Sequence, residues 1–199
     1  FPTDAAMNTI YRLLKSKYRL DFSQYKASPI GRRIERRLLM APVSDLDAYV
    51  ERLQADENEL DQLYRDLLIG VTHFFRDAEA FKMLESRLLP QLIDGCEDHE
   101  QFRVWVAGCA TGEEVYSLAI LLHEEFERRQ RPINFKIFAT DVHEGSLAFA
   151  NQGVYTKEAL GELSPSRLAK FFKPVTDGYQ VCQHLREQVV FAMHNVTAD

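Results

Sequence analysis

The chain has 199 residues, of which 46% are hydrophobic and 27% are charged, as is typical of a globular protein. No apolar run approaches the roughly 20 residues that a membrane-spanning helix needs, so membrane insertion is not expected. The N-terminus lacks the basic flank and following apolar stretch that are typical of a signal peptide. The three cysteines are scattered and the six histidines lack metal-ligand spacing, which favours a reducing, cytoplasmic location and disfavours a disulfide scaffold or a metal site.

Charge divides the chain into a basic head and an acidic body. Residues 1–54 hold 10 Lys and Arg against 6 Asp and Glu, whereas residues 55–199 hold 14 against 24. A basic head on an acidic body suggests that the head meets an acidic partner. Chance asymmetry between solvated helices explains the same numbers, and charge alone does not decide between the two.

Residues 1–70 are expected to form an all-helical domain of about four helices. Ser44 precedes LDAYVERL with Asp47 three residues on, which predicts an N-cap at Ser44. Apolar residues recur at helical spacing in three stripes. The stripes are Ile10, Leu13, Leu14 and Tyr18; Ile34, Leu38 and Leu39; and Leu60, Leu63, Leu67 and Leu68.

A basic run, SPIGRRIERRLL, lies on one of these helices. Its spacing predicts that the arginines lie on the exposed side while Ile34, Leu38 and Leu39 turn inward. A solvated basic face is the usual explanation, and docking to an acidic helix or to nucleic acid is the functional one. The acidic body and the lack of interleaved surface aromatics count against nucleic acid. The arginines are Arg32, Arg33, Arg36 and Arg37.

The segment IGVTHFFRD, residues 69–77, joins the two halves of the chain. Phe74 and Phe75 are expected in the core whatever the function. Thr72 and Arg76 are the candidates for function, because an arginine at a domain junction can clamp a carboxylate with its planar fork. An ordinary surface ion pair is the default reading of Arg76 in isolation. A helix is expected from about residue 77 to 93.

The stretch from Phe102 to Leu118 predicts a buried strand, a glycine loop and the start of a helix. A second strand, FKIFATD, ends at Asp141, and this arrangement is the front half of a nucleotide- or nucleoside-binding α/β fold. The loop GCATGEE, with Gly108 and Gly112, is not a G-x-G-x-x-G fingerprint. Asp141 follows Gly108 by 33 residues, whereas a dinucleotide site has its acid about 20 residues on. A single nucleoside therefore fits better.

Three acidic residues near this loop have competing interpretations. Thr111 and Glu114 have the spacing of a capping box, which leaves Glu113 to face the cofactor. Asp141 at the tip of its strand has the position to accept hydrogen bonds from both ribose hydroxyls. The alternative for Asp141 is an N-cap of the following helix, paired with Glu144.

The rest of the chain predicts a short helix ending at Gly153, a helix opened by Ser164 and Pro165, and three short strands with a turn at Asp177-Gly178. Alternating strands and helices, interrupted by a hairpin, imply a parallel sheet with a small inserted antiparallel unit. The chain begins without Met and stops after only a few strands of such a sheet, so we expect it to be a fragment of a longer protein.

Several landmarks occur in an order that closely resembles the bacterial chemotaxis receptor methyltransferases, the CheR family. They are THFFRD, VWVAGCATGEEVYSLAI, FATDVHEGSLAFANQGVY and VVFAMHN, and the resemblance covers essentially the whole chain. It implies an α/β protein with an N-terminal all-α domain at 1–70. The methyltransferase domain at 71–199 would then hold a Rossmann-like S-adenosylmethionine-binding sheet, incomplete here, and a small antiparallel β-subdomain near 171–191. The helix around YKASPIGRRIERRL looks most like family members fused to methylesterase and sensor modules.

The resemblance also implies the chemistry. Such enzymes use S-adenosylmethionine to methylate glutamate side chains on the cytoplasmic helices of receptors, leaving S-adenosylhomocysteine. Arg76 would lie near the transferring methyl and align the reacting groups, Asp141 would hold the ribose, and Asn195 the adenine edge. The basic helix would face the acidic receptor bundle, and the β-subdomain docks a receptor tail peptide in some members. The implied cofactor contacts are Thr72, Arg76, Gly108, Glu113, Asp141, Asn195 and Val196.

Two departures from the family pattern bear on activity. The family often has Asn where this chain has Gly70, and its later Cys-Arg-Asn segment and following Tyr would lie beyond Asp199. A non-catalytic module that binds S-adenosylmethionine or S-adenosylhomocysteine within a signalling protein is therefore an alternative. A nucleic-acid methyltransferase is a third and weaker one.

Overall fold

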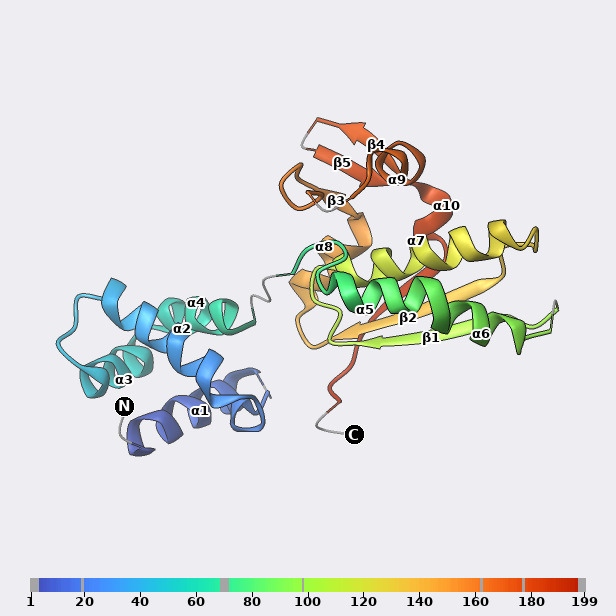
Figure 1. Cartoon of the computed structure of the whole chain (residues 1–199). Coiled ribbons are helices and arrows are strands. Elements are labelled where there is room, and N and C mark those ends of the chain that lie inside the picture. Colours follow the sequence, from blue (N-terminus) through green and yellow to red (C-terminus); the bar gives the residue numbers. More distant parts are fainter. Residues whose placement is uncertain are drawn as a thin grey trace. The chain divides into compact units, whose positions relative to one another are not determined.

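The computed structural model describes residues 4–18, 20–68, 72–97, 99–161, 163–176 and 178–196. The chain divides into two compact units, Phe1–Ile69 and Gly70–Asp199, each with its own core (Figure 1). Gly70, where the family often has Asn, and Asp177 of the expected turn both lie outside the described residues. No described helix combines the length and the apolar character needed to cross a bilayer.

The first unit is all-helical, as predicted. Its core contains residues of all three apolar stripes, and Ile10, Leu14, Ile34 and Leu63 are fully buried there. Burying such aliphatic side chains stabilises the bundle by roughly 1.5–3 kcal/mol each. The helices are α1 (Asp4–Tyr18), α2 (Ala27–Met40), α3 (Leu46–Ala55) and α4 (Glu57–Leu68), with a 3₁₀ turn η1 (Phe22–Gln24) between the first two.

The N-cap predicted at Ser44 is wrong by one residue. Asp45 caps α3 instead, because its Oδ1 accepts a hydrogen bond from the Ala48 backbone N–H at 2.9 Å. Ser44 takes a supporting role, since its hydroxyl donates to the other oxygen of Asp45 at 2.9 Å.

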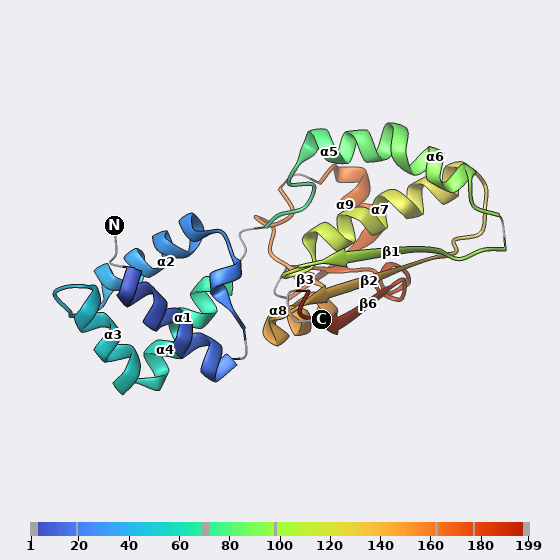
Figure 2. The same ribbon diagram turned by 90° about the horizontal axis from the view of Figure 1, so that it is seen from below.

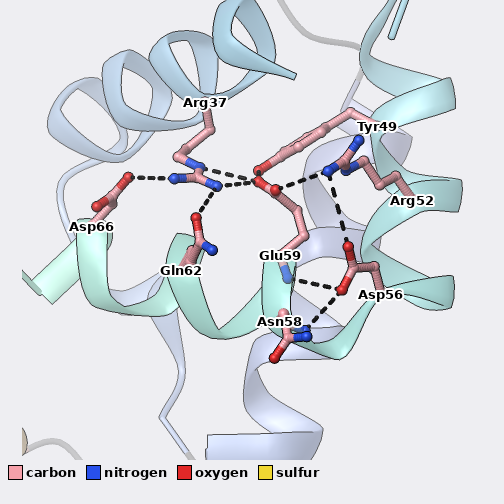
Figure 3. A network of polar contacts seen from close by, with 8 residues as sticks. All are labelled: Arg37, Tyr49, Arg52, Asp56, Asn58, Glu59, Gln62 and Asp66. Atoms are coloured by element: carbon pink, nitrogen blue, oxygen red, sulfur yellow. Dashed lines mark hydrogen bonds and ion pairs between the residues drawn. The ribbon is translucent and has the colours of Figure 1, made fainter. Parts of the chain in front are cut away.

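The prediction for the basic helix α2 is wrong for two residues. Arg37 does not lie on the exposed side: its side chain is 12% exposed and binds the buried Glu59 of α4 (Figure 3). Leu39 does not turn inward but is 87% exposed. Both follow from helix geometry, because Arg37 lies three positions after the buried Ile34 and so shares its face, whereas Leu39 lies five positions after it on the other side. Arg32 and Arg36 are exposed as expected, and Arg33 donates to the Leu67 carbonyl at 3.1 Å.

The second unit is an α/β fold built on a three-stranded parallel sheet. The strand order is β1-β2-β6, and Val106 lies beside Ala139 in register. The helices are α5 (Ala78–Met83), the π-helical segment η2 (Leu84–Leu88), α6 (Leu89–Asp94), α7 (Glu113–Arg128), α8 (Glu144–Gln152), α9 (Pro165–Phe171) and α10 (Gln183–Arg186). The strands are β1 (Phe102–Ala107), β2 (Phe135–Asp141), β3 (Val154–Tyr155), β4 (Phe172–Val175), β5 (Gly178–Val181) and β6 (Val189–Met193).

The helix expected over residues 77–93 is present as α5, η2 and α6 in continuous succession, and its π-helical turn was not predicted. Together with α7 it covers one face of the parallel sheet, as Figure 2 shows. Val115, Ala119, Leu122 and Phe126 of α7 lie in the core. Pro132 follows the helix, which ends at Arg128.

The expectation that the first strand is buried is wrong for one of its faces. Side chains alternate along a strand, so Val106 points into the core while Trp105 points to the other side. Trp105, Phe138 and Val190 are aligned across the three strands, and they are 59%, 41% and 40% exposed.

The small antiparallel sheet has the strand order β3-β5-β4. Its hairpin partners, β4 and β5, pair Phe172 with Val181 and Val175 with Gly178. The helix predicted to end at Gly153 does so, and Ser164 caps α9 by accepting from the Arg167 N–H. The third strand predicted in the tail, β6, belongs to the parallel sheet and not to this one, and the short helix α10 was not predicted.

Candidate functional site

The candidate site lies at the carboxyl ends of the three parallel strands. The loop after β1 holds Gly108, β2 ends at Asp141, and β6 is followed by Asn195 and Val196. The ladder extends past the last strand, since the His194 N–H donates to the Asp141 carbonyl at 3.0 Å. Ligands of open α/β sheets bind outside this edge, so the fold brings these predicted residues together where a cofactor is expected.

The glycine loop has a conformation that side chains rarely adopt. Gly108, Ala110 and Gly112 all have left-handed backbones, with φ of 70°, 46° and 92°. The backbone of Ala110 is strained in this conformation, because a residue with a Cβ is disfavoured at positive φ. The geometry is held by Asp141, whose Oδ2 accepts from the Ala110 N–H at 2.8 Å.

Asp141 is not the N-cap of α8. His143 caps that helix, because its Nδ1 accepts from the Ser146 N–H. The second oxygen of Asp141 accepts from the His143 N–H at 3.0 Å. One half-buried carboxylate thus ties the loop after β1 to the turn after β2, a role that the sequence did not indicate.

The capping box predicted for Thr111 and Glu114 is wrong. Gly112 occupies the N-cap position of α7, and the Thr111 hydroxyl donates to Glu113 Oε2 at 2.6 Å, while Glu114 is exposed. Glu113 is 5% exposed, and its burial raises the pKa of the carboxyl above its ordinary value, opposed by the Thr111 hydrogen bond. A buried carboxylate beside the loop needs a cation for full stabilisation.

Cys109 is the thiol of the loop. It is 3% exposed, and burial raises its pKa to about 12. Because the thiolate is the reactive form, this thiol is inert at neutral pH. The loop therefore offers hydrogen bonds and shape, not covalent catalysis.

The segment that holds Thr72 and Arg76 is anchored beside the loop. The Phe75 N–H donates to Ser117 Oγ at 3.0 Å, and Ser117 in turn donates to the Glu113 carbonyl at 2.7 Å. Phe74 and Phe75 are buried, as predicted. Thr72 is half-buried and Arg76 is exposed. Arg76 directly follows Phe75, whose backbone is the point of attachment to α7.

The remaining predicted residues are more exposed or lie elsewhere. Asn195 is half-buried and Val196 is 53% exposed just after β6. The four arginines of α2 belong to the other compact unit. In the described part of the chain, no group of three or more histidine, cysteine or acidic side chains could hold a metal ion.

Sequence reasoning missed Tyr155. This buried tyrosine of β3 donates a hydrogen bond from its hydroxyl to the Thr111 carbonyl of the loop at 2.7 Å. No local pattern could reveal it, because the two residues are 44 positions apart and the acceptor is a backbone carbonyl.

Both units match known family descriptions. Residues 5–68 match the family described as "CheR methyltransferase, all-alpha domain", and residues 70–199 match "CheR methyltransferase, SAM binding domain". The second description names S-adenosylmethionine as the ligand of the domain that contains the glycine loop.

Individual proteins are similar over almost the whole chain. A Rhodobacter capsulatus protein named "Uncharacterized 104.1 kDa protein in hypE 3'region" is 38% identical over 98% of this chain, which spans only 20% of that protein. Proteins named "Chemotaxis protein methyltransferase" from Listeria innocua and Escherichia coli are each 29% identical. They align with 94% and 98% of this chain, which spans 70% and 68% of their lengths.

Proposed function

The chain belongs to the CheR methyltransferase family, and on that premise we propose that it transfers methyl groups from S-adenosylmethionine to glutamate side chains of chemoreceptor cytoplasmic helices. The observation that carries the proposal is the tie between Asp141 and Ala110, which holds a left-handed loop at the carboxyl edge of the parallel sheet. We place the activity in the cytoplasm, where such receptor helices lie.

The residues present fit a nucleoside cofactor with a charged tail. A Cβ added at Gly108 would meet no atom within 4 Å, so the space beside the loop is open. Asp141 ends β2, and Asn195 and Val196 follow β6, the next strand of the sheet. We propose that Asp141 binds the ribose and Asn195 the adenine, with Val196 against the adenine ring. Thr72, Arg76 and Glu113 would hold the amino acid end, whose ammonium would pair with the buried carboxylate of Glu113.

The chemistry requires little acid–base work from the protein. S-adenosylmethionine supplies a methyl group that is activated by its sulfonium. A glutamate side chain, with a reference pKa of about 4.3, is already ionised at neutral pH. Its oxygen would attack the methyl carbon directly while the carbon–sulfur bond breaks and S-adenosylhomocysteine leaves. Catalysis is then orientation and removal of water from two charged groups, and we propose that Arg76 aligns them.

We expect Glu113→Gln to weaken binding of S-adenosylhomocysteine about 20-fold at pH 7.5, while raising the melting temperature of the unliganded protein by a few degrees. The raised pKa of Glu113 means that the unliganded fold is stabilised by protonation and loses that stability as the pH rises through this pKa. An uncharged amide removes this cost, but it also removes the charge that pairs with the ligand's ammonium. Calorimetry and thermal melts measure both effects.

The same titration gives wild-type binding a pH dependence. Affinity should fall as the pH drops through the raised pKa of Glu113 and should stay flatter in Glu113→Gln. Glu114→Gln is the matched control, because the neighbouring carboxylate is exposed. Equal binding by Glu113→Gln and Glu114→Gln would remove Glu113 from the cofactor site.

For the receptor, we propose that the exposed Arg32 and Arg36 of α2 meet the acidic helices. Arg33 and Arg37 bind the Leu67 carbonyl and Glu59, so their part in docking is to support the helix. The small antiparallel sheet is the proposed dock for a receptor tail peptide, because an extended peptide can add a strand at a sheet edge.

The function is tested by transfer of a radiolabelled methyl group from S-adenosylmethionine to a receptor cytoplasmic fragment. We expect incorporation that base hydrolyses, because a glutamate methyl ester is base-labile. Arg76→Ala should lower kcat about 100-fold, since it misaligns the reacting groups. Arg32→Ala combined with Arg36→Ala should instead raise KM for the receptor about fivefold, with less effect at high salt.

Two controls match these variants. Arg87→Ala removes an exposed arginine from the same unit as Arg76, and Arg12→Ala with Arg65→Ala removes two exposed arginines from the same unit as α2. Cofactor binding without any transfer would favour the non-catalytic module, and label retained on nucleic acid would overturn the receptor assignment. An unchanged kcat in Arg76→Ala would remove that residue from catalysis.

A further inference from the structure

Tyr155 connects the small antiparallel sheet with both parts of the proposed cofactor site. Its side chain is 1% exposed, and its hydroxyl donates to the Thr111 carbonyl in the glycine loop at 2.7 Å. Its ring meets Phe74 edge-on, with the ring centroids 4.9 Å apart, in the segment that leads to Arg76. One side chain therefore supports the loop and the segment together.

The backbone of Tyr155 is held equally firmly by the small sheet. Tyr155 of β3 pairs with Tyr179 of β5, and β5 pairs with β4. At Gly178 the φ is +139°, and an added Cβ would lie 2.3 Å from the Tyr155 carbonyl oxygen. Backbone contact this close means that any shift of β5 moves Tyr155 with it.

The loop side of the connection is also tightly packed. A Cβ added at Gly112 would lie 3.0 Å from the Tyr155 hydroxyl and 2.9 Å from the Ala150 Cβ. Since closely packed interiors transmit displacements and do not absorb them, a movement of the hydroxyl changes the position of Thr111. Thr111 in turn donates to Glu113, which we place against the cofactor.

We propose that Tyr155 is a positioning residue that couples the small sheet to the cofactor loop, so that a displacement of β5 changes the affinity for the cofactor. The proposal rests on the proposed cofactor site and adds a regulatory input to it. A segment that binds along the small sheet acts through the Tyr155 hydroxyl and the Thr111 carbonyl, without touching the cofactor.

The test compares two buried tyrosines that make the same kind of hydrogen bond. Tyr155→Phe removes the bond to the Thr111 carbonyl, and Tyr116→Phe removes one to the Ala150 carbonyl at 2.9 Å. Both variants should lose similar thermal stability. Only Tyr155→Phe should weaken binding of S-adenosylhomocysteine, by about tenfold, which corresponds to about 1.4 kcal/mol. Equal affinity of the two variants would overturn the proposal.

Coupling between β5 and the cofactor loop is tested separately by introducing Gly178→Ala into the wild type and into Tyr155→Phe. We expect this strained substitution to weaken binding about fivefold in the wild type and less than twofold in Tyr155→Phe, because the connection is already cut. Equal losses in the two backgrounds would contradict coupling. If wild-type protein binds no S-adenosylhomocysteine, the cofactor proposal itself is wrong, and the two failures are thus distinguishable.

Hydrogen exchange gives a second measurement that does not depend on folding of the Gly178 variant. The Val181 N–H donates to the Gly153 carbonyl at 2.9 Å and reports on the opening of β5. Adding S-adenosylhomocysteine should slow its exchange in Tyr116→Phe. The same slowing in Tyr155→Phe would show that the hydroxyl carries no coupling.

Discussion

Replacing Asp141 with alanine is expected to weaken binding of S-adenosylhomocysteine by about 100-fold, or about 2.7 kcal/mol. The carboxylate accepts from the Ala110 N–H at 2.8 Å and from the His143 N–H at 3.0 Å. Hydrogen bonds to a charged group contribute about 1.5–3 kcal/mol each, and without them the strained backbone of Ala110 has no support. The proposed bonds to the ribose are lost as well. Isothermal calorimetry measures the change directly.

Two further variants separate these contributions. Asp141→Asn keeps the shape of the side chain, but its amide N–H₂ faces one of the two backbone N–H groups and cannot accept a hydrogen bond from it. We therefore expect a loss of affinity that is smaller than in Asp141→Ala. Asp45→Ala removes another aspartate that accepts a backbone N–H, in the other unit. It should cost about 1 kcal/mol of stability and leave binding unchanged. Binding by Asp141→Ala within twofold of the wild type would remove Asp141 from the site.

The elements of the fold follow from local patterns in the sequence. The stripe in α4 predicted a buried face, and Gly153 and Ser164 marked helix boundaries that the structure confirms. The strands β1 and β2 were evident because apolar runs are bounded by the glycine loop and by Asp141. These signals depend only on residues a few positions apart, which is why they can be read without the fold.

Only part of the candidate site could be predicted from local sequence patterns. Gly108 and Asp141 were recognisable, but the capping box at Thr111 was wrong because the left-handed Gly112 takes the N-cap. The hydrogen bond from Ala110 to Asp141 spans 31 positions. Such contacts depend on how two strands come together, and no spacing rule predicts them.

The burial of Arg37 illustrates a different limit. We expected Arg37 on the exposed side because charged residues usually lie in solvent, but its spacing of three from the buried Ile34 puts it on the inner face of α2. Its partner, Glu59, lies 22 positions away on α4 and is itself buried. Each buried charge requires the other, and no spacing within α2 predicts a partner on another helix.

Replacing Glu59 with alanine is expected to destabilise the helical unit by about 3–5 kcal/mol, the largest stability effect that we predict for a single substitution. Glu59 Oε1 accepts from Arg37 at 2.6 Å and from the Tyr49 hydroxyl at 2.9 Å, and Arg52 lies 3.5 Å from its other oxygen (Figure 3). Removing the carboxylate leaves the guanidinium of Arg37 buried without its main counter-charge. Alanine is the best helix former, so the loss cannot be assigned to helix propensity.

Denaturant titration followed by circular dichroism measures this loss. The single tryptophan, Trp105, lies in the other unit, so its fluorescence reports that unit separately and should show an unchanged transition. Asp66→Ala is the matched control, because Asp66 lies 3.4 Å from the same guanidinium but is 36% exposed, and removal of an exposed partner costs about 1 kcal/mol or less.

The double variant Arg37→Met with Glu59→Met decides what the pair contributes. Removing both charges relieves the desolvation cost of each, so stability should return to within about 1–2 kcal/mol of the wild type, whereas each single alanine variant stays strongly destabilised. If the double variant keeps its fold but raises KM for the receptor, the network serves to orient α2 and not to stabilise it. If KM is also unchanged, Arg37 and Glu59 are not needed for docking. The docking face is then assigned to Arg32 and Arg36.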